Sequence, residues 1–217
     1  MTPQPTFLFD LDGTLADTLG DIAASTNFVR AAHGLPDVGD AVVRSFVGDG
    51  ARTLLRRDFE QVLPAAGDQQ DRFLDAAFAT YAEHHQEQCL QLVQPYPGVR
   101  DFLAAHHARG CRMAVVTNKP ARFAAPKVRH LGLGEWLPVV IGGDTLPVRK
   151  PDPAPLRLAL QRLGAPHTGV TMVGDGVQDL RAGKAAGLRT VACLFGFGEP
   201  AALRREGADE FWQTFGG

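Results

Sequence analysis

Short apolar runs recur along this chain, and each of them ends in a polar or glycine-rich turn. They comprise residues 7–9, 113–116, 139–141, 171–173 and 190–194. Runs of this length that are apolar at every position are typical of strands buried on both faces, as in a parallel sheet. The chain is therefore expected to build a parallel sheet covered by helices.

Helical segments separate these runs in the second half of the chain. Residues 99–110 and 179–187 each end on a glycine, and residues 153–164 begin near prolines and end at a glycine. Proline at the start and glycine just past the end are the usual boundary signals of a helix. Strand and helix thus alternate from Pro97 onward, which predicts an α/β fold with a doubly wound, Rossmann-like parallel sheet.

The first apolar run is set apart from this alternation by a long helical stretch. Residues 15–93 contain no convincing strand and are rich in Ala, Leu, Arg and Gln at helical spacing, with breaks at 33–39, 47–50 and 63–68. We therefore predict a helical-bundle cap domain over residues 16–93, inserted into a core domain formed by residues 1–15 and 94–217.

Composition narrows the class of protein. The hydrophobic fraction of 45% is that of a globular chain, and a net charge of −2 argues against a general nucleic-acid surface. No apolar run approaches the length of a membrane span, and the N-terminal residues lack the pattern of a signal peptide. Cys89, Cys111 and Cys193 are scattered, as expected of reduced thiols. We expect a cytoplasmic protein, either monomeric or homodimeric.

Polar side chains follow four of the predicted strands. They are Asp10 and Asp12, then Thr117, Asn118 and Lys119, then Lys150, and finally Asp175 and Asp179. In sheets of this kind ligands bind beyond the carboxyl ends of the strands, so these groups should share one edge. Oxygen ligands without His or Cys suit a hard cation such as Mg²⁺, and lysine and threonine beside it suit a phosphate.

Taken one at a time, these signals have ordinary explanations. Asp10 to Thr14 could be a capped turn, Lys150 a surface lysine, and Asp175-Gly176 a common turn dipeptide. The segment GDGVQD is not a dinucleotide-binding GxGxxG, because Asp179 occupies the place of the third glycine. The coincidence of polar residues at successive strand ends favours a site over these separate explanations.

In this order, DLDGTLADT, VVTNK, RKPDP and VGDGVQDL resemble the four motifs of the haloacid dehalogenase (HAD) superfamily of phosphohydrolases. The resemblance covers essentially the whole chain, including the position of the cap. Within the superfamily the chain is most similar to the bacterial phosphoglycolate phosphatases, through YPGV, VVIGGDT, KPDPAPL and, in the cap, VRSFVGDG.

The resemblance implies a role for each motif residue. Asp10 is the expected nucleophile, forming an aspartyl-phosphate, and Asp12 the general acid and base. Thr117, Asn118 and Lys150 are expected to bind the phosphoryl group. Mg²⁺ is the expected cofactor, ligated by Asp10, the backbone carbonyl of Asp12 and Asp175, with Asp179 orienting the site.

The resemblance also implies a substrate class. Single residues distinguish the chain from family members that catalyse other reactions. True dehalogenases lack an aspartate at the position of Asp12, and sugar phosphomutases carry a cap histidine at the position of Ile22. The resemblance therefore implies hydrolysis of a small phosphorylated metabolite, with 2-phosphoglycolate as the first candidate. A sugar phosphate or nucleotide, and a non-catalytic phosphate-binding relative, stay open as alternatives.

Two further expectations concern the substrate end of the site and a departure from the family pattern. The turn VRSFVGDGAR offers Arg44 and Arg52, and the backbone N–H groups at Gly48 and Gly50, as candidate groups for a substrate carboxylate. The family usually has serine where this chain has Gly176, followed here by Val177, so a hydroxyl is missing beside Asp175.

Overall fold

A computed structural model describes residues 4–217, and its centre is a six-stranded parallel sheet with the strand order β5-β4-β1-β6-β7-β8. The strands are β1 (Thr6–Phe9), β4 (Arg112–Val116), β5 (Val139–Ile141), β6 (Val170–Gly174), β7 (Arg189–Cys193) and β8 (Glu210–Trp212). Every apolar run identified in the sequence coincides with one of these strands, with Leu194 alone falling just past the end of β7. The predicted doubly wound α/β fold is confirmed.

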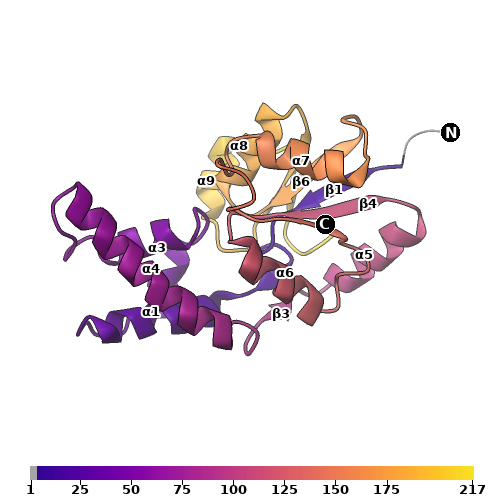
Figure 1. Ribbon diagram of the computed structural model, residues 1–217. Helices are drawn as coiled ribbons and strands as arrows, with labels where there is room; N and C mark the ends of the chain where they lie inside the picture. The colour runs from indigo at the N-terminus through magenta and orange to yellow at the C-terminus, as the bar shows by residue number, and fades with distance from the viewer. Residues whose placement is uncertain (1–3) are drawn as a thin grey trace.

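Helices cover both faces of the sheet, as Figure 1 shows. They are α5 (Val99–Ala108), α6 (Ala121–His130), α7 (Ala154–Leu163), α8 (Val177–Ala185) and α9 (Pro200–Glu206). Alternating side chains of β1 serve the two faces: Phe9 packs with Val115 and Val173 in one apolar cluster, and Leu8 packs in another. Both faces of the central strand are therefore covered by apolar packing, as the continuous apolar runs predicted.

Strand β8 was not anticipated from the sequence. It is a three-residue edge strand that pairs with β7, and it carries a mixture of polar and apolar residues. An edge strand needs no run that is apolar throughout, so the pattern used to find the other strands does not detect it.

Four helices stand between β1 and the rest of the sheet: α1 (Leu19–Ala32), α2 (Asp40–Phe46), α3 (Ala51–Asp58) and α4 (Asp68–Gln88). We call this group the helical insertion; it has its own apolar cluster, which includes Val29, Leu55, Phe59 and Leu74. Figure 1 shows its helices (indigo to purple) projecting to one side of the sheet and its covering helices. The boundaries at residues 15/16 and 93/94 stay a prediction.

The two chain segments that join the insertion to the sheet run side by side. β2 (Ala16–Asp17) pairs antiparallel with β3 (Gln94–Pro95), so Asp17 lies opposite Gln94. A two-residue strand is too short to produce an alternating pattern, which explains why no strand was predicted there. Within residues 4–217, no helix combines the length and the apolar character that crossing a membrane requires.

A fully buried ion pair ties the insertion to the helices on the sheet. Lys127 Nζ of α6 lies 3.2 Å from Asp21 Oδ2 of α1, and neither side chain is exposed. Asp21 Oδ1 also accepts a hydrogen bond from the backbone N–H of Leu92, at 3.1 Å. Charges removed from water in this way depend on each other for their stabilisation.

Removing one member of this pair is expected to destabilise the protein strongly. Lys127→Met leaves Asp21 buried without its counter-charge, so the free energy of unfolding should fall by about 3–5 kcal/mol in urea titrations. Arg189→Met, which breaks the exposed Arg189–Glu210 pair, is the control and should cause a much smaller change. Equal effects of the two variants would contradict the structural role of the buried pair.

Candidate active site

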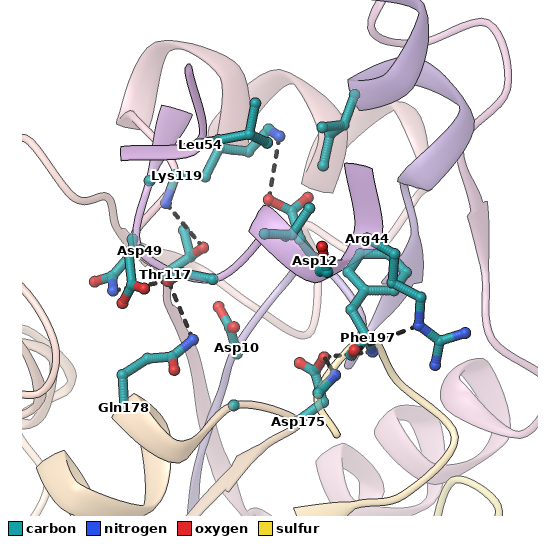
Figure 2. A pocket seen from close by; sticks show the side chains of 18 of the residues that line it. Asp10, Asp12, Arg44, Asp49, Leu54, Thr117, Lys119, Asp175, Gln178 and Phe197 are labelled. Carbon is teal, nitrogen blue, oxygen red and sulfur yellow. Dashed lines mark hydrogen bonds and ion pairs between the residues drawn. The ribbon is translucent and has the colours of Figure 1, made fainter. Parts of the chain in front are cut away.

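The polar residues that follow the strands meet at one edge of the sheet. Asp10 follows β1 directly, Thr117 follows β4 and Asp175 follows β6. Because β4, β1 and β6 are neighbouring parallel strands, their carboxyl ends bring these three side chains together. A cavity of about 510 Å³ opens there between the sheet edge and the helical insertion, lined by residues of both. Figure 2 shows Asp10 lying between Asp12 and Asp175 in this cavity.

Lys150 lies in the loop after β5 and is buried beneath the cavity. Its Nζ is 3.1 Å from Asp10 Oδ1 and 2.6 Å from Asp179 Oδ1, and it donates to the carbonyl of Val116 at 2.5 Å. Burial by itself lowers the pKa of Lys150, but the two carboxylates outweigh burial and raise the pKa above its usual value. Lys150 is therefore a buried, positively charged residue of the site. The alternative that it is an ordinary surface lysine is wrong.

Asp10, Asp175 and Asp179 form a carboxylate cluster in which one oxygen of each lies within 4.8 Å of the others. Burial raises the pKa of Asp10 to about 8, with Lys150 opposing and the neighbouring carboxylates adding to the effect. Burial and Asp179 raise the pKa of Asp175 to about 6. One lysine does not balance three carboxylates, so the cluster fits a divalent cation with oxygen ligands.

Hydrogen bonds and close packing orient the Asp175 carboxylate. Its Oδ1 accepts from the hydroxyl of Thr14 at 2.8 Å, and its Oδ2 from the backbone N–H of Phe197 at 2.7 Å. Gly13 has a φ of +82°, and a Cβ there would lie 2.2 Å from Asp175 Oδ2. Gly13 thus permits both the turn after Asp12 and the approach of Asp175.

The Asp12 side chain is held apart from this cluster. Its Oδ1 accepts from the Thr18 hydroxyl at 2.8 Å, and its Oδ2 lies 3.1 Å from Lys119 Nζ. Both members of the Lys119–Asp12 pair are largely buried. The sequence places Lys119 among the lysines suited to a phosphate, but it does not predict the pairing of Lys119 with Asp12. Its place in the VTNK motif, directly after Thr117 and Asn118, was the available signal.

The phosphoryl-binding candidates from β4 lie at the cavity. Thr117 is buried, and its Oγ1 accepts from the backbone N–H of Lys119 at 3.2 Å. The side-chain amide of Asn118 donates to the carbonyls of Lys150, at 2.9 Å, and Gly48, at 3.0 Å. Asn118 thus connects two loops of the site with the insertion.

The candidate carboxylate-binding groups of the insertion are only partly brought to the cavity. Gly48, Gly50 and Arg44 line it, but the Arg44 guanidinium donates to the backbone carbonyls of Gly196 and Phe197. Arg52 is not among the lining residues.

The Arg52 guanidinium points instead along the outside of the insertion. It pairs with Asp71 and Asp75 of α4, at 3.0 Å each. Helix α3 presents one face to the cavity, with Leu54 among the lining residues, and Arg52 lies on another face. The positions of residues in the sequence do not show which face of a helix a side chain occupies. For this reason the sequence predicted the same candidate role for Arg44 and Arg52.

Comparison with known proteins assigns the family. The family model of haloacid dehalogenase-like hydrolases matches residues 7–193, so the chain belongs to this family of hydrolases, as its motifs predicted. A phosphoglycolate phosphatase of Pseudomonas syringae pv. tomato is 40% identical over 200 residues, covering 90% of this chain and 72% of the relative.

Two other similarities point to related phosphatases. An N-acetylmuramic acid 6-phosphate phosphatase of Pseudomonas aeruginosa is 40% identical over 195 residues, covering 89% of this chain and 83% of the relative. A crystal structure described as a predicted phosphoglycolate phosphatase from Haemophilus somnus superposes with a TM-score of 0.88 at 28% identity, covering 99% of this chain and 96% of that chain.

The buried carboxylates make the stability of the metal-free protein depend on pH. Because the pKa values of Asp10 and Asp175 are raised, the folded chain binds more protons than the unfolded chain above about pH 4. Burial lowers the pKa of His85, which opposes this effect below about pH 6.5. Stability should therefore fall as pH rises from 6.5 to 8. A pKa that differs by one between the two states is worth about 1.4 kcal/mol, and we expect a decrease of at least that size.

Urea titrations of EDTA-treated protein at pH 5, 6.5 and 8 test this expectation. A divalent cation should reverse the decrease and stabilise the protein more at pH 8 than at pH 5. Stability that is flat or increases between pH 6.5 and 8 in EDTA would show that the cluster is not charged in the way the geometry indicates.

Proposed function

We propose that this chain is a Mg²⁺-dependent phosphomonoester hydrolase that works through an aspartyl-phosphate on Asp10. The single observation that carries the proposal is the placement of Asp10 in contact with Lys150 and in one cluster with the carboxylates of Asp175 and Asp179. Family membership and the names of the relatives support it.

The proposed reaction has two transfers. A carboxylate oxygen of Asp10 attacks phosphorus, the ester P–O bond breaks, and Asp12 donates its proton to the departing alcohol. Water then attacks the aspartyl-phosphate, Asp12 takes a proton from that water, and inorganic phosphate leaves. In both transfers Lys150 stabilises charge on the phosphoryl oxygens. Before the first transfer its positive charge favours the ionised form of Asp10, against the burial and the neighbouring carboxylates that raise the pKa of this group.

The metal role rests on the carboxylate cluster. We propose that Asp10, Asp175 and the backbone carbonyl of Asp12 ligate Mg²⁺, and that Asp179 orients the site from its position beside Lys150. Bound Mg²⁺ would offset the negative charge of the cluster and of the substrate phosphate. Asp179 also accepts from the backbone N–H of Gly176 at 2.9 Å, which fixes the start of α8 beside Asp175.

2-Phosphoglycolate is the first substrate candidate, because several curated relatives are named for it. A phosphorylated sugar is the second candidate. It is favoured by the relative named for N-acetylmuramic acid 6-phosphate and by a cavity whose volume of about 510 Å³ is typical of sites for larger metabolites. A cytoplasmic location and a monomeric or homodimeric state stay predictions.

Two carboxamide variants separate the proposed roles of the two aspartates. Asp10→Asn removes the nucleophile with little change of shape, so kcat should fall at least about a thousandfold. Asp12→Asn should lower kcat by about a hundredfold or more while Mg²⁺ binding, measured calorimetrically, stays close to wild type. An Asp10→Asn variant with more than a trace of activity would exclude Asp10 as the nucleophile.

Arg44 and Arg52 test which groups meet the substrate. Arg44 joins the insertion to the Gly196–Phe197 loop, so Arg44→Ala should lower kcat/KM about three- to tenfold for both 2-phosphoglycolate and an aryl phosphate. Arg52→Ala should change kcat/KM for either substrate by less than about twofold, because its partners lie on α4. A loss confined to 2-phosphoglycolate in either variant would instead identify that arginine as the carboxylate-binding group.

A further inference from the structure

Two side-chain amides converge on one backbone carbonyl of the helical insertion. Asn118 Nδ2 lies 3.0 Å from the carbonyl oxygen of Gly48, and Gln178 Nε2 lies 3.1 Å from the same oxygen. Asn118 follows β4 and Gln178 lies in the first turn of α8, so both donors come from the sheet edge that carries the candidate active site. Figure 2 shows the Gln178 amide directed toward the turn that carries Asp49.

The Gln178 side chain passes through a space that only glycines leave open. A Cβ on Gly176 would lie 2.2 Å from Gln178 Nε2 and 2.5 Å from its Cδ. A Cβ on Gly48 would lie 2.6 Å from the same nitrogen. Any larger residue at position 176 would therefore push the Gln178 amide away from the Gly48 carbonyl.

This space gives a physical reason for glycine at position 176. A serine there would place a Cβ and a hydroxyl where the Gln178 amide lies. Gln178 itself is 9% exposed, and its backbone is fixed because the adjacent Asp179 closes the first turn of α8 on Gly176. The amide is therefore directed at the insertion, where it donates to the Gly48 carbonyl.

We propose that Gln178 is a positioning residue, which holds the turn of residues 47–50, between α2 and α3, over the phosphoryl site. We further propose that position 176 is glycine in this chain because only glycine leaves room for the Gln178 amide. The turn contributes Val47, Gly48, Asp49 and Gly50 to the cavity wall, so its position sets the space for the leaving group. The kinetic part of this proposal rests on the proposed function; the structural part does not.

The contact joins α8 directly to the turn of residues 47–50. Helix α8 carries the carboxylate Asp179 of the cluster, and the turn closes the cavity from the opposite side. Losing the Gln178 hydrogen bond leaves Asn118 as the remaining donor to Gly48. The turn should then move more while the carboxylate cluster keeps its geometry, so Mg²⁺ binding and substrate positioning separate.

The test uses Gln178→Met, Gly176→Ser and the double variant, with Gln70→Met as the control. Methionine has the length of glutamine but no donor, and Gln70 is a glutamine of the insertion whose amide donates to the Pro64 carbonyl at 3.2 Å. Hydrogen exchange of the backbone N–H groups of residues 48–54 is measured by mass spectrometry on the unliganded protein. Kinetics use an aryl phosphate and 2-phosphoglycolate over a range of Mg²⁺ concentrations.

Gln178→Met and Gly176→Ser should each speed exchange in residues 48–54 and lower kcat/KM about three- to tenfold, chiefly through KM. The double variant should be no worse than either single variant, because both remove the same contact. The Mg²⁺ concentration for half-maximal activity should be unchanged in Gln178→Met, and Gln70→Met should match wild type in all measurements.

Three results would overturn the proposal. Unchanged exchange in residues 48–54 would show that Gln178 does not hold the turn. Losses that multiply in the double variant would show that Gly176 acts independently, through the metal ligand beside it. A kcat effect with KM preserved would place Gln178 in the chemistry itself. If wild type hydrolyses no phosphomonoester, the proposed function fails, and the exchange measurement still decides whether Gln178 holds the turn.

Discussion

The burial of three carboxylates against one lysine is the constraint on which the rest of this structure depends. Asp10, Asp175 and Asp179 reach one another because neighbouring parallel strands and the start of α8 end at the same edge. Taking charged groups out of water is costly unless they are paired. Lys150 supplies part of the pairing, and the remaining negative charge is what makes the site suited to a divalent cation and a phosphate.

The helical insertion and the sheet edge together enclose the cavity. It forms the other wall of the cavity, and it is tied to the sheet and its helices by the buried Asp21–Lys127 pair and by the Gly48 carbonyl. The two kinds of contact differ in location: the ion pair lies between α1 and α6, whereas Gly48 lies over the cavity. Fold stability and positioning of the substrate are thereby assigned to separate residues.

The sheet and the carboxylate cluster could be predicted from the sequence because both follow from short-range patterns. Apolar runs mark strands buried on both faces, and the residue after each strand must lie at the shared edge. The Lys119–Asp12 pair and the pairing of Arg52 with Asp71 and Asp75 were missed because they depend on which way each side chain points after folding. Edge strand β8 was missed for a different reason, since it contains no continuous apolar run. The reason for Gly176 was likewise invisible, since the amide that fills its space belongs to Gln178.

The central claim is that Asp10 accepts the phosphoryl group from the substrate. Rapid acid quenching of a reaction, followed by borohydride reduction and peptide mass spectrometry, tests this claim directly, because reduction converts an aspartyl-phosphate to homoserine. The account predicts homoserine at position 10 in the presence of substrate and Mg²⁺, and none in the Asp10→Asn variant. Rapid turnover without homoserine at position 10, or with homoserine at position 12 or 175 instead, would contradict it.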